Sequence, residues 1–258
     1  MEYKDILFSD SDGIGFLTLN NPEKINALSV NMLKEIKDVL TNVSVNENVK
    51  VIIIKAAGRH FCAGHNLSEM VGAGMKEYKF IFDQCTKLME LIHEIPQPVI
   101  AQVQGIATAA GCQLVAWCDL AVAEQGAKFS TPGVKIGLFC TTPMVAITRA
   151  IGRKAAMEML LTGRSFPAEE AKALGLINKV VPLADLEAQT EKMARDIVNA
   201  SGLVLGIGKQ AFYDQIDMSD TKAFKYAKHT IALNNMAEDA QNGICAFLEK
   251  KTPEWKNR

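Results

Sequence analysis

Residues 99–113 hold the stretch that decides the fold. Val99-Ile-Ala-Gln-Val103 is a short apolar run, as expected of a strand that is covered on both faces, and Gly105 ends it. The next residues, Ile106-Ala-Thr-Ala-Ala110-Gly111-Cys-Gln113, form a small-residue turn that leads into a short apolar helix. Small residues let the backbone approach a neighbour closely. The stretch therefore predicts a strand–turn–helix unit of an α/β protein.

A second segment upstream has the same design. Val51-Ile-Ile-Ile54 is a continuous β-branched run, and a loop follows it that contains Phe61-Cys-Ala-Gly-His65-Asn-Leu67. Ligands of α/β sheets gather at the carboxyl ends of strands, and a helix N-terminus offers free N–H groups to negative charge. The residues alone leave two interpretations equally open. The loops bind a ligand, or their small residues only permit tight packing of strand on helix.

The rest of the chain extends this pattern. We expect further strands at Ile14–Leu19 and Leu120–Ala123, and helices behind Ser29 and over Lys76–Glu94. Alternating strands and helices favour an α/β architecture with right-handed crossovers. From about Thr142 onward the periodicity is mainly helical.

Composition excludes several classes of function. The 258 residues include 48% hydrophobic and 22% charged residues, and the formal net charge is −1. No basic surplus points to nucleic acid, and no apolar run reaches the length of about 20 residues that spans a membrane. The N-terminus has no signal-peptide pattern, and the six cysteines include no C-x-x-C pair. We therefore expect a cytoplasmic protein with reduced, mostly buried thiols.

Four segments resemble, in order, motifs of the crotonase (enoyl-CoA hydratase/isomerase) superfamily: Asn21–Leu28, Phe61–Leu67, Gln104–Leu114 with Cys118-Asp119, and Ala168–Val181. The resemblance spans nearly the whole chain. It implies a crotonase-like α/β spiral of βαβ units, a β-superhelix, over residues 1–200. It also implies that residues 201–258 form a helical region that makes trimers, alone or as a dimer of trimers, and closes the CoA pocket.

The resemblance also implies a ligand and a role for each loop. The ligand is an acyl-CoA, and no cofactor beyond its CoA moiety and no metal is expected. The backbone N–H groups of His65 and Ala110 would form an oxyanion hole that holds the thioester oxygen as charge builds towards an enolate. The residues expected to contact CoA, the last two across a subunit interface, are Lys24, Ala63, His65, Ala110, Phe247 and Lys250.

The sequence departs from the superfamily where hydratases place two catalytic carboxylates. Gln113 stands at the first position, and Gly133 in Thr131-Pro132-Gly133 stands at the second. Neither residue takes up a proton at neutral pH. The next stretch, Gly137-Leu-Phe-Cys-Thr-Thr-Pro-Met144, is similar to that of the superfamily branch labelled enoyl-CoA hydratase domain-containing protein 3.

Other side chains are candidates for the missing chemistry. Cys140 and Thr141 follow the altered segment, and Cys140 is either a nucleophile or a packed thiol. The His65 ring is either an acid or base, or a part of the pocket wall. Glu77 and Asp83 either face the site or belong to a solvated helix surface.

Two classes of function follow. The first is an enzyme, a crotonase-family lyase or isomerase acting on acyl-CoA, in which hydration is doubtful because both glutamates are missing. Decarboxylation of a malonyl-type CoA or thioester hydrolysis would suit its residues better. The second is a catalytically silent relative that binds acyl-CoA.

Overall fold

The computed structural model describes residues 3–258 and contains a six-stranded sheet in the order β1-β2-β3-β4-β6-β9. Strand β1 runs antiparallel to β2, and the other neighbours are parallel. The bounds are β1 Ile6–Ser11, β2 Ile14–Leu19, β3 Val51–Ala56, β4 Val99–Val103, β6 Leu120–Glu124 and β9 Lys179–Val181. The predicted strands and the α/β class are confirmed, and β1 and β9 were not assigned from the sequence.

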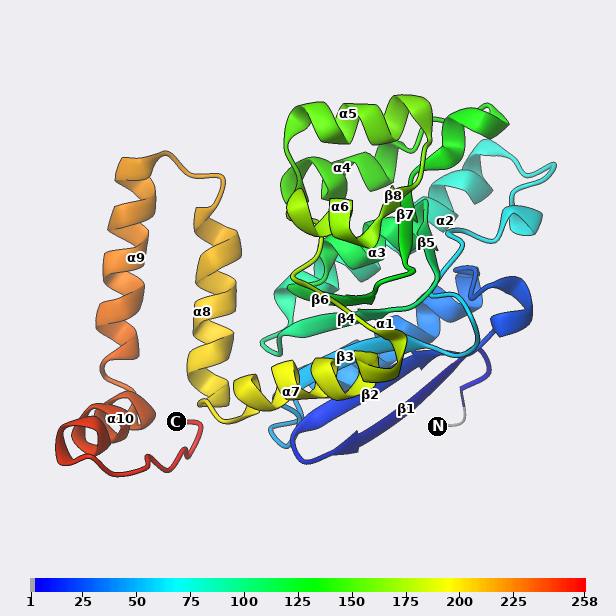
Figure 1. The fold of residues 1–258 in the computed structure, drawn as a ribbon. Helices are drawn as coiled ribbons and strands as arrows, with labels where there is room; N and C mark the ends of the chain where they lie inside the picture. Colours follow the sequence, from blue (N-terminus) through cyan, green and yellow to red (C-terminus); the bar gives the residue numbers. More distant parts are fainter. Residues whose placement is uncertain (1–2) are drawn as a thin grey trace.

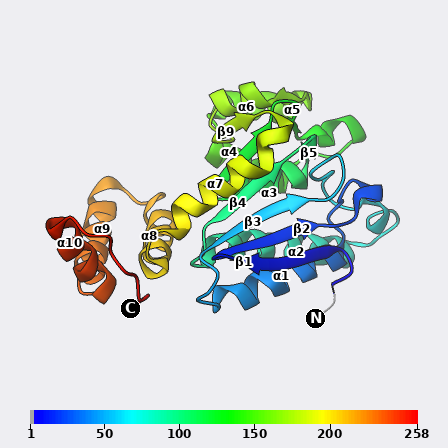
Figure 2. The same ribbon diagram turned by 60° about the horizontal axis from the view of Figure 1, so that its bottom comes forward.

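Helices cover both faces of this sheet (Figures 1 and 2). On one face lie α1 (Val30–Ser44) and α2 (Met75–Glu94), and their apolar side chains pack with Ile52 and Ile54 of β3. On the other face α7 (Leu186–Val198) contributes Ala194 to a cluster with Val51 and Ile53. Successive residues of β3 point to opposite faces, so burial on both faces explains its continuous apolar run.

A second, three-stranded sheet lies beside the first and holds the segment that follows β4. Its order is β5-β7-β8, with bounds Ile106–Thr108, Lys128–Ser130 and Phe166–Pro167. These strands are too short to show a hydrophobic period, so the sequence did not predict them. The helices that follow them are α3 (Ala110–Trp117), η3 (Pro132–Ile136), α4 (Thr141–Ala150), α5 (Arg153–Thr162) and α6 (Ala168–Ala173).

The C-terminal helices α8 (Gly202–Gln215), α9 (Asp220–Asn234) and α10 (Glu238–Glu249) extend away from the sheets (Figures 1 and 2). Large apolar side chains on them are exposed, among them Phe224, Leu233 and Phe247. The division at residue 200 and the assembly into trimers stay predictions. Within residues 3–258, no helix has both the length and the apolarity that a membrane crossing needs.

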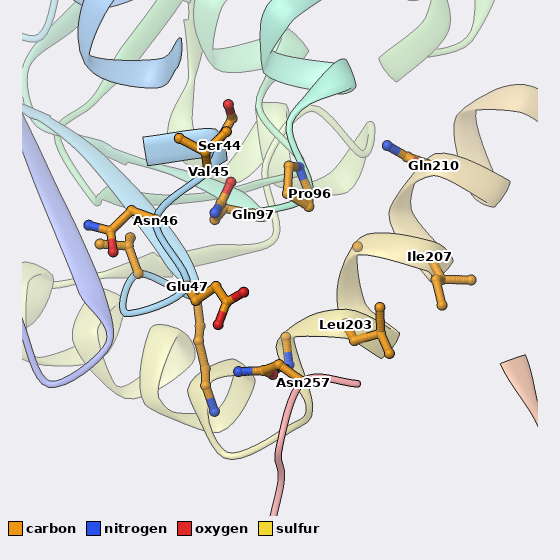
Figure 3. Close-up of a pocket in the computed structure, with 14 residues that line it drawn as sticks. Ser44, Val45, Asn46, Glu47, Pro96, Gln97, Leu203, Ile207, Gln210 and Asn257 are labelled. Carbon is orange, nitrogen blue, oxygen red and sulfur yellow. Dashed lines mark hydrogen bonds between the residues drawn. The ribbon is translucent and has the colours of Figure 1, made fainter. Parts of the chain in front are cut away.

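A cavity of about 360 Å³ lies where α8 leaves the body of the molecule. Figure 3 shows Leu203, Ile207 and Gln210 of α8 on one side of it and Gln97 on the other. Helix α8 packs tightly on Pro96 at one point, since a Cβ atom on Gly206 would lie 2.8 Å from Cβ of Pro96. The cavity therefore lies between α8 and the body of the molecule.

Candidate active site

The two small-residue loops follow the carboxyl ends of the neighbouring strands β3 and β4, and they pair with each other. The Cys62 N–H donates to the Ile106 carbonyl at 3.0 Å, and the Thr108 N–H donates to the Cys62 carbonyl at 2.9 Å. Gly111 packs on the same residue, because a Cβ atom there would lie 2.5 Å from the Cys62 carbonyl oxygen. The small residues thus permit tight packing, as one of the two interpretations held.

Gly64 is another point of close approach between the loops. Its φ is +94°, and a Cβ atom there would lie 2.8 Å from Cβ of Ala109 and 3.1 Å from the Ala110 nitrogen. Only glycine combines this backbone conformation with this lack of space. The peptide that follows Gly64 carries the His65 N–H, so the loops bring the His65 and Ala110 N–H groups into one region.

Neither of these two N–H groups donates a hydrogen bond to another group in residues 3–258. Residue 65 pairs with Leu28 only through its flanking peptides: Leu28 N–H donates to the Gly64 carbonyl at 2.7 Å, and Asn66 N–H donates to the Leu28 carbonyl at 3.1 Å. Ala110 is the first residue of α3, and the N–H of a first helical residue has no acceptor within its own helix. The arrangement offers two donors, one at the positive end of a helix, to a negatively charged oxygen.

Ala109 holds the second loop in a strained conformation. Its φ is +51° and its ψ is −119°, which alanine rarely adopts, and its N–H donates to the Ser130 carbonyl at 2.9 Å. Strain of this kind persists only where the surroundings enforce it. Sequence reasoning gave Ala109 no role of its own, because the conformation depends on contacts with β7.

The His65 ring packs against Phe82 of α2. It lies edge-on to Phe82, with ring centroids 5.4 Å apart, and its Nε2 is buried without a hydrogen-bond partner in the described chain. Burial lowers the pKa of His65 to about 4. The imidazole is therefore neutral at physiological pH.

Gln113 is buried on α3, and its Oε1 has no hydrogen-bond partner among residues 3–258. The same holds for the Oγ1 atom of Thr131, directly before η3. Buried polar atoms without partners are rare and point to a missing ligand or water. Thr131 was not a candidate, because nothing in the sequence pattern distinguishes it.

Gly133 and Cys140 are in contact across the turn that joins η3 to α4. A Cβ atom on Gly133 would lie 2.8 Å from Cys140 Sγ and 2.7 Å from the Leu138 carbonyl oxygen. Burial raises the pKa of Cys140, so its thiol stays protonated and the packed-thiol interpretation gains support. Thr141 begins α4 beside it and is exposed.

The structure brings some of the expected CoA contacts together and leaves others apart. The Ala63 N–H donates to the Ile25 carbonyl at 2.9 Å, which places Ala63 beside the segment that carries the exposed Lys24 (η1, Pro22–Lys24). Phe247 and Lys250 are exposed at the end of α10, far from this segment in one chain (Figure 1). Their contact with CoA stays a prediction that requires a second subunit.

The remaining candidates have local explanations. Glu77 caps α2, because its Oε2 accepts the Gly74 N–H at 3.1 Å. Asp83 is exposed on the same helix. Within residues 3–258, no group of three or more His, Cys, Asp or Glu side chains is placed to hold a metal ion. Among the cysteines, five are buried and Cys245 is exposed, and all are free thiols, as predicted.

Comparison with known proteins places the chain in a family. The model of the family described as Enoyl-CoA hydratase/isomerase matches residues 9–258. The chain belongs to this family. Enoyl-CoA hydratase domain-containing protein 3 of Rattus norvegicus is 44% identical over 247 residues, which cover 95% of this chain and 82% of that protein. The Homo sapiens protein of the same name is also 44% identical, over the same shares.

Solved structures of the enoyl-CoA hydratase/isomerase family confirm the fold. The structure described as an enoyl-CoA hydratase of Mycobacterium smegmatis has a TM-score of 0.96 and 44% identity, over 98% of this chain and 99% of that one. The human enoyl-CoA hydratase domain-containing protein 3 has a TM-score of 0.96 and 43% identity, over 98% and 100%. The crotonase-like architecture with a helical C-terminal region, and the resemblance to this branch, are thus confirmed.

One expectation from the sequence was wrong. The five relatives named enoyl-CoA hydratase domain-containing protein 3, which are 44% or 45% identical to this chain, are all named as mitochondrial. This finding contradicts a cytoplasmic location. The missing C-x-x-C pattern and the reduced thiols do not distinguish the cytoplasm from other reducing compartments, so they could not support that choice.

Proposed function

We propose that the protein binds an acyl-CoA thioester and stabilises an enolate of it with the N–H groups of His65 and Ala110. The observation that carries this proposal is the pair of unpaired donors that Gly64 holds at close approach. Donors fixed before the reaction need no reorganisation as negative charge develops, and one such donor is typically worth about 3–4 kcal/mol of barrier lowering.

The favoured reaction is one that needs the enolate alone. Decarboxylation of a malonyl-type CoA fits, because the C–C bond electrons that remain after CO2 leaves form the enolate without a base. A proton from water then completes the product. Hydration fits poorly, since the Gln113 amide cannot move a proton and Gly133 carries no side chain. Among titratable side chains, the one nearest in sequence to the two N–H donors is the neutral ring of His65 itself.

A catalytically silent acyl-CoA-binding protein is the second candidate. It is favoured by the contact between Gly133 and Cys140, which leaves no room for an acidic side chain at that position. Both candidates keep the same binding mode and differ only in turnover. The names of the curated relatives favour a mitochondrial site of action for either one.

The decisive experiment compares pairs of ligands that differ at the thioester oxygen. Butyryl-CoA and its thioether analogue S-butyl-CoA are titrated by calorimetry. The thioester should bind about tenfold more tightly, because only it can accept the two N–H donors. Equal affinities, or no binding of either ligand, would contradict the oxyanion hole.

Turnover is measured in the same samples by mass spectrometry, with crotonyl-CoA and malonyl-CoA as substrates. Release of acetyl-CoA from malonyl-CoA without hydration of crotonyl-CoA would support the favoured reaction. Binding of all esters without conversion would support the silent protein. Hydration of crotonyl-CoA would show that other residues replace the two missing carboxylates.

A further inference from the structure

The side-chain amide of Gln113 is buried, and its hydrogen-bonding groups are unused. The residue is 5% exposed, and neither its Oε1 nor its Nε2 has a hydrogen-bond partner within residues 3–258. The two atoms differ in access, because Oε1 is among the fully enclosed polar atoms without a partner and Nε2 is not. A buried amide without partners is unfavourable unless a ligand or water pairs with it. Nε2, with its two N–H donors, is therefore the atom available to such a group.

Helix geometry places this amide beside the proposed oxyanion hole. Gln113 follows Ala110 by three residues on α3, so the two residues lie on the same face of the helix. Side chains of a helix point back towards its N-terminus, so the Gln113 side chain extends over the turn that carries the Ala110 N–H. A ligand whose thioester oxygen accepts from Ala110 would therefore present the rest of its acyl group to Gln113.

The candidate side chains of this region carry no charge at neutral pH. Helix α3 contains no Asp, Glu, Lys or Arg, and Gln113 and Gly133 stand where hydratases of the family place two carboxylates. Burial lowers the pKa of His65 to about 4 and raises the pKa of Cys140, so both side chains are neutral.

This absence of charge bears on which acyl groups the site accepts. Two carboxylates would repel an acyl group that is itself an anion. Neutral N–H donors and the positive end of α3 attract one instead. The charge pattern therefore favours a ligand whose acyl group carries a carboxylate.

We infer that Gln113 is a specificity-determining residue, which donates from Nε2 to the free carboxylate of a short dicarboxylic acyl-CoA such as a malonyl thioester. The inference rests on the proposed function, because it places this carboxylate beside a thioester held by His65 and Ala110. It applies equally to a decarboxylase and to a silent binding protein. In decarboxylation the C–C bond breaks, CO2 leaves and the negative charge moves to the thioester oxygen. A neutral amide suits this step, since an ion pair would stabilise the carboxylate more than the transition state.

Two stable thioethers of CoA, titrated by calorimetry into the whole chain, test the inference. S-(2-carboxyethyl)-CoA carries a carboxylate where malonyl-CoA has one, and S-butyl-CoA has a similar length without the charge. Neither ligand has a thioester oxygen, so their comparison does not depend on the oxyanion hole. Gln113→Leu and Gln113→Glu should each weaken S-(2-carboxyethyl)-CoA by at least about tenfold at pH 8, the first through loss of the donor and the second through repulsion. S-butyl-CoA should change by less than about twofold, which also shows that the variants are folded.

A pH series separates recognition of the carboxylate from a structural effect. In Gln113→Glu the new acid is charged above its pKa and repels the ligand, whereas below its pKa the protonated acid donates a hydrogen bond. Affinity for S-(2-carboxyethyl)-CoA, relative to S-butyl-CoA, should therefore rise in this variant from pH 8 to pH 5 and stay constant in the wild type. Gln210→Glu adds the same charge at an exposed position on α8, and this matched control should behave as the wild type does.

Three results would overturn the inference: equal weakening of both thioethers in the Gln113 variants, unchanged binding of S-(2-carboxyethyl)-CoA in both variants, or no binding of either thioether to the wild type. Failure of the oxyanion hole is seen separately, as equal affinities of butyryl-CoA and S-butyl-CoA. That result would leave a carboxylate preference lost in the Gln113 variants standing.

Discussion

The Sγ atom of Cys140 lies 2.8 Å from the point where a side chain at Gly133 would begin. Real Cβ atoms essentially never approach a neighbour so closely, and the Leu138 carbonyl oxygen lies at 2.7 Å on the same point. An acid at position 133 therefore requires the backbone of residues 138–140 to move. Replacing Gly133 by glutamate would not by itself restore the carboxylate pair of a hydratase.

Gly133→Ala should lower the free energy of unfolding by about 1–3 kcal/mol, because the added methyl group overpacks this turn. Urea unfolding followed by circular dichroism measures the change. Adding Cys140→Ala to this variant should recover only part of the loss, since the Leu138 carbonyl remains in the way. A Gly133→Ala protein as stable as the wild type would show that the turn yields easily.

Gly64→Ala should abolish thioester binding, because the methyl group would press on Ala109 and on the Ala110 nitrogen. Gly72→Ala is the matched control. Its φ is +72°, so alanine is strained there too, yet a Cβ atom would meet nothing within 4 Å. Calorimetry with butyryl-CoA should show binding lost in the first variant and kept in the second. Equal loss in both would assign the effect to backbone strain alone.

Local patterns account for what the sequence predicted well. The strand β3, the helix behind Ser29 and the Gly64 and Gly105 turns are each specified by a few consecutive residues. The Oγ of Ser29 accepts the Met32 N–H at 3.0 Å, as expected of an N-cap. Family resemblance added the order of these units in the fold, which periodicity alone does not determine.

What the sequence did not predict depends on contacts between segments. The strain at Ala109 is set by a hydrogen bond to β7, and the fit of Cys140 against Gly133 depends on the path of a turn. Strand β9 has only three residues and joins the sheet beside β6. In the sequence alone, no pattern distinguishes these residues, because their roles depend on tertiary packing.

Lys209→Ala should lower the free energy of unfolding by about 3–5 kcal/mol, because it breaks a buried ion pair. The Lys209 Nζ lies 2.8 Å from Asp119 Oδ2 and donates to the Ile92 and Gln97 carbonyls at 2.6 and 2.8 Å. These bonds hold α8 to the body of the molecule. Lys222→Ala, at an exposed position on α9, is the control and should change little. A loss below about 1 kcal/mol for Lys209→Ala would mean that water replaces the amine.

His65→Gln should make the protein less sensitive to acid. Burial lowers the pKa of His65 from 6.5 to about 4, so between these values the unfolded chain binds a proton that the folded chain does not. The stability this neutral ring contributes is complete above pH 6.5 and is lost as the pH falls towards 4. The wild type should therefore lose about 3 kcal/mol more than the variant between pH 7 and pH 4. Urea unfolding at several pH values measures this difference, and parallel curves would mean that folding does not lower the pKa of the ring. The variant keeps the backbone N–H of residue 65, so butyryl-CoA should still bind to it at pH 7. Loss of that binding would instead assign the interaction to the imidazole.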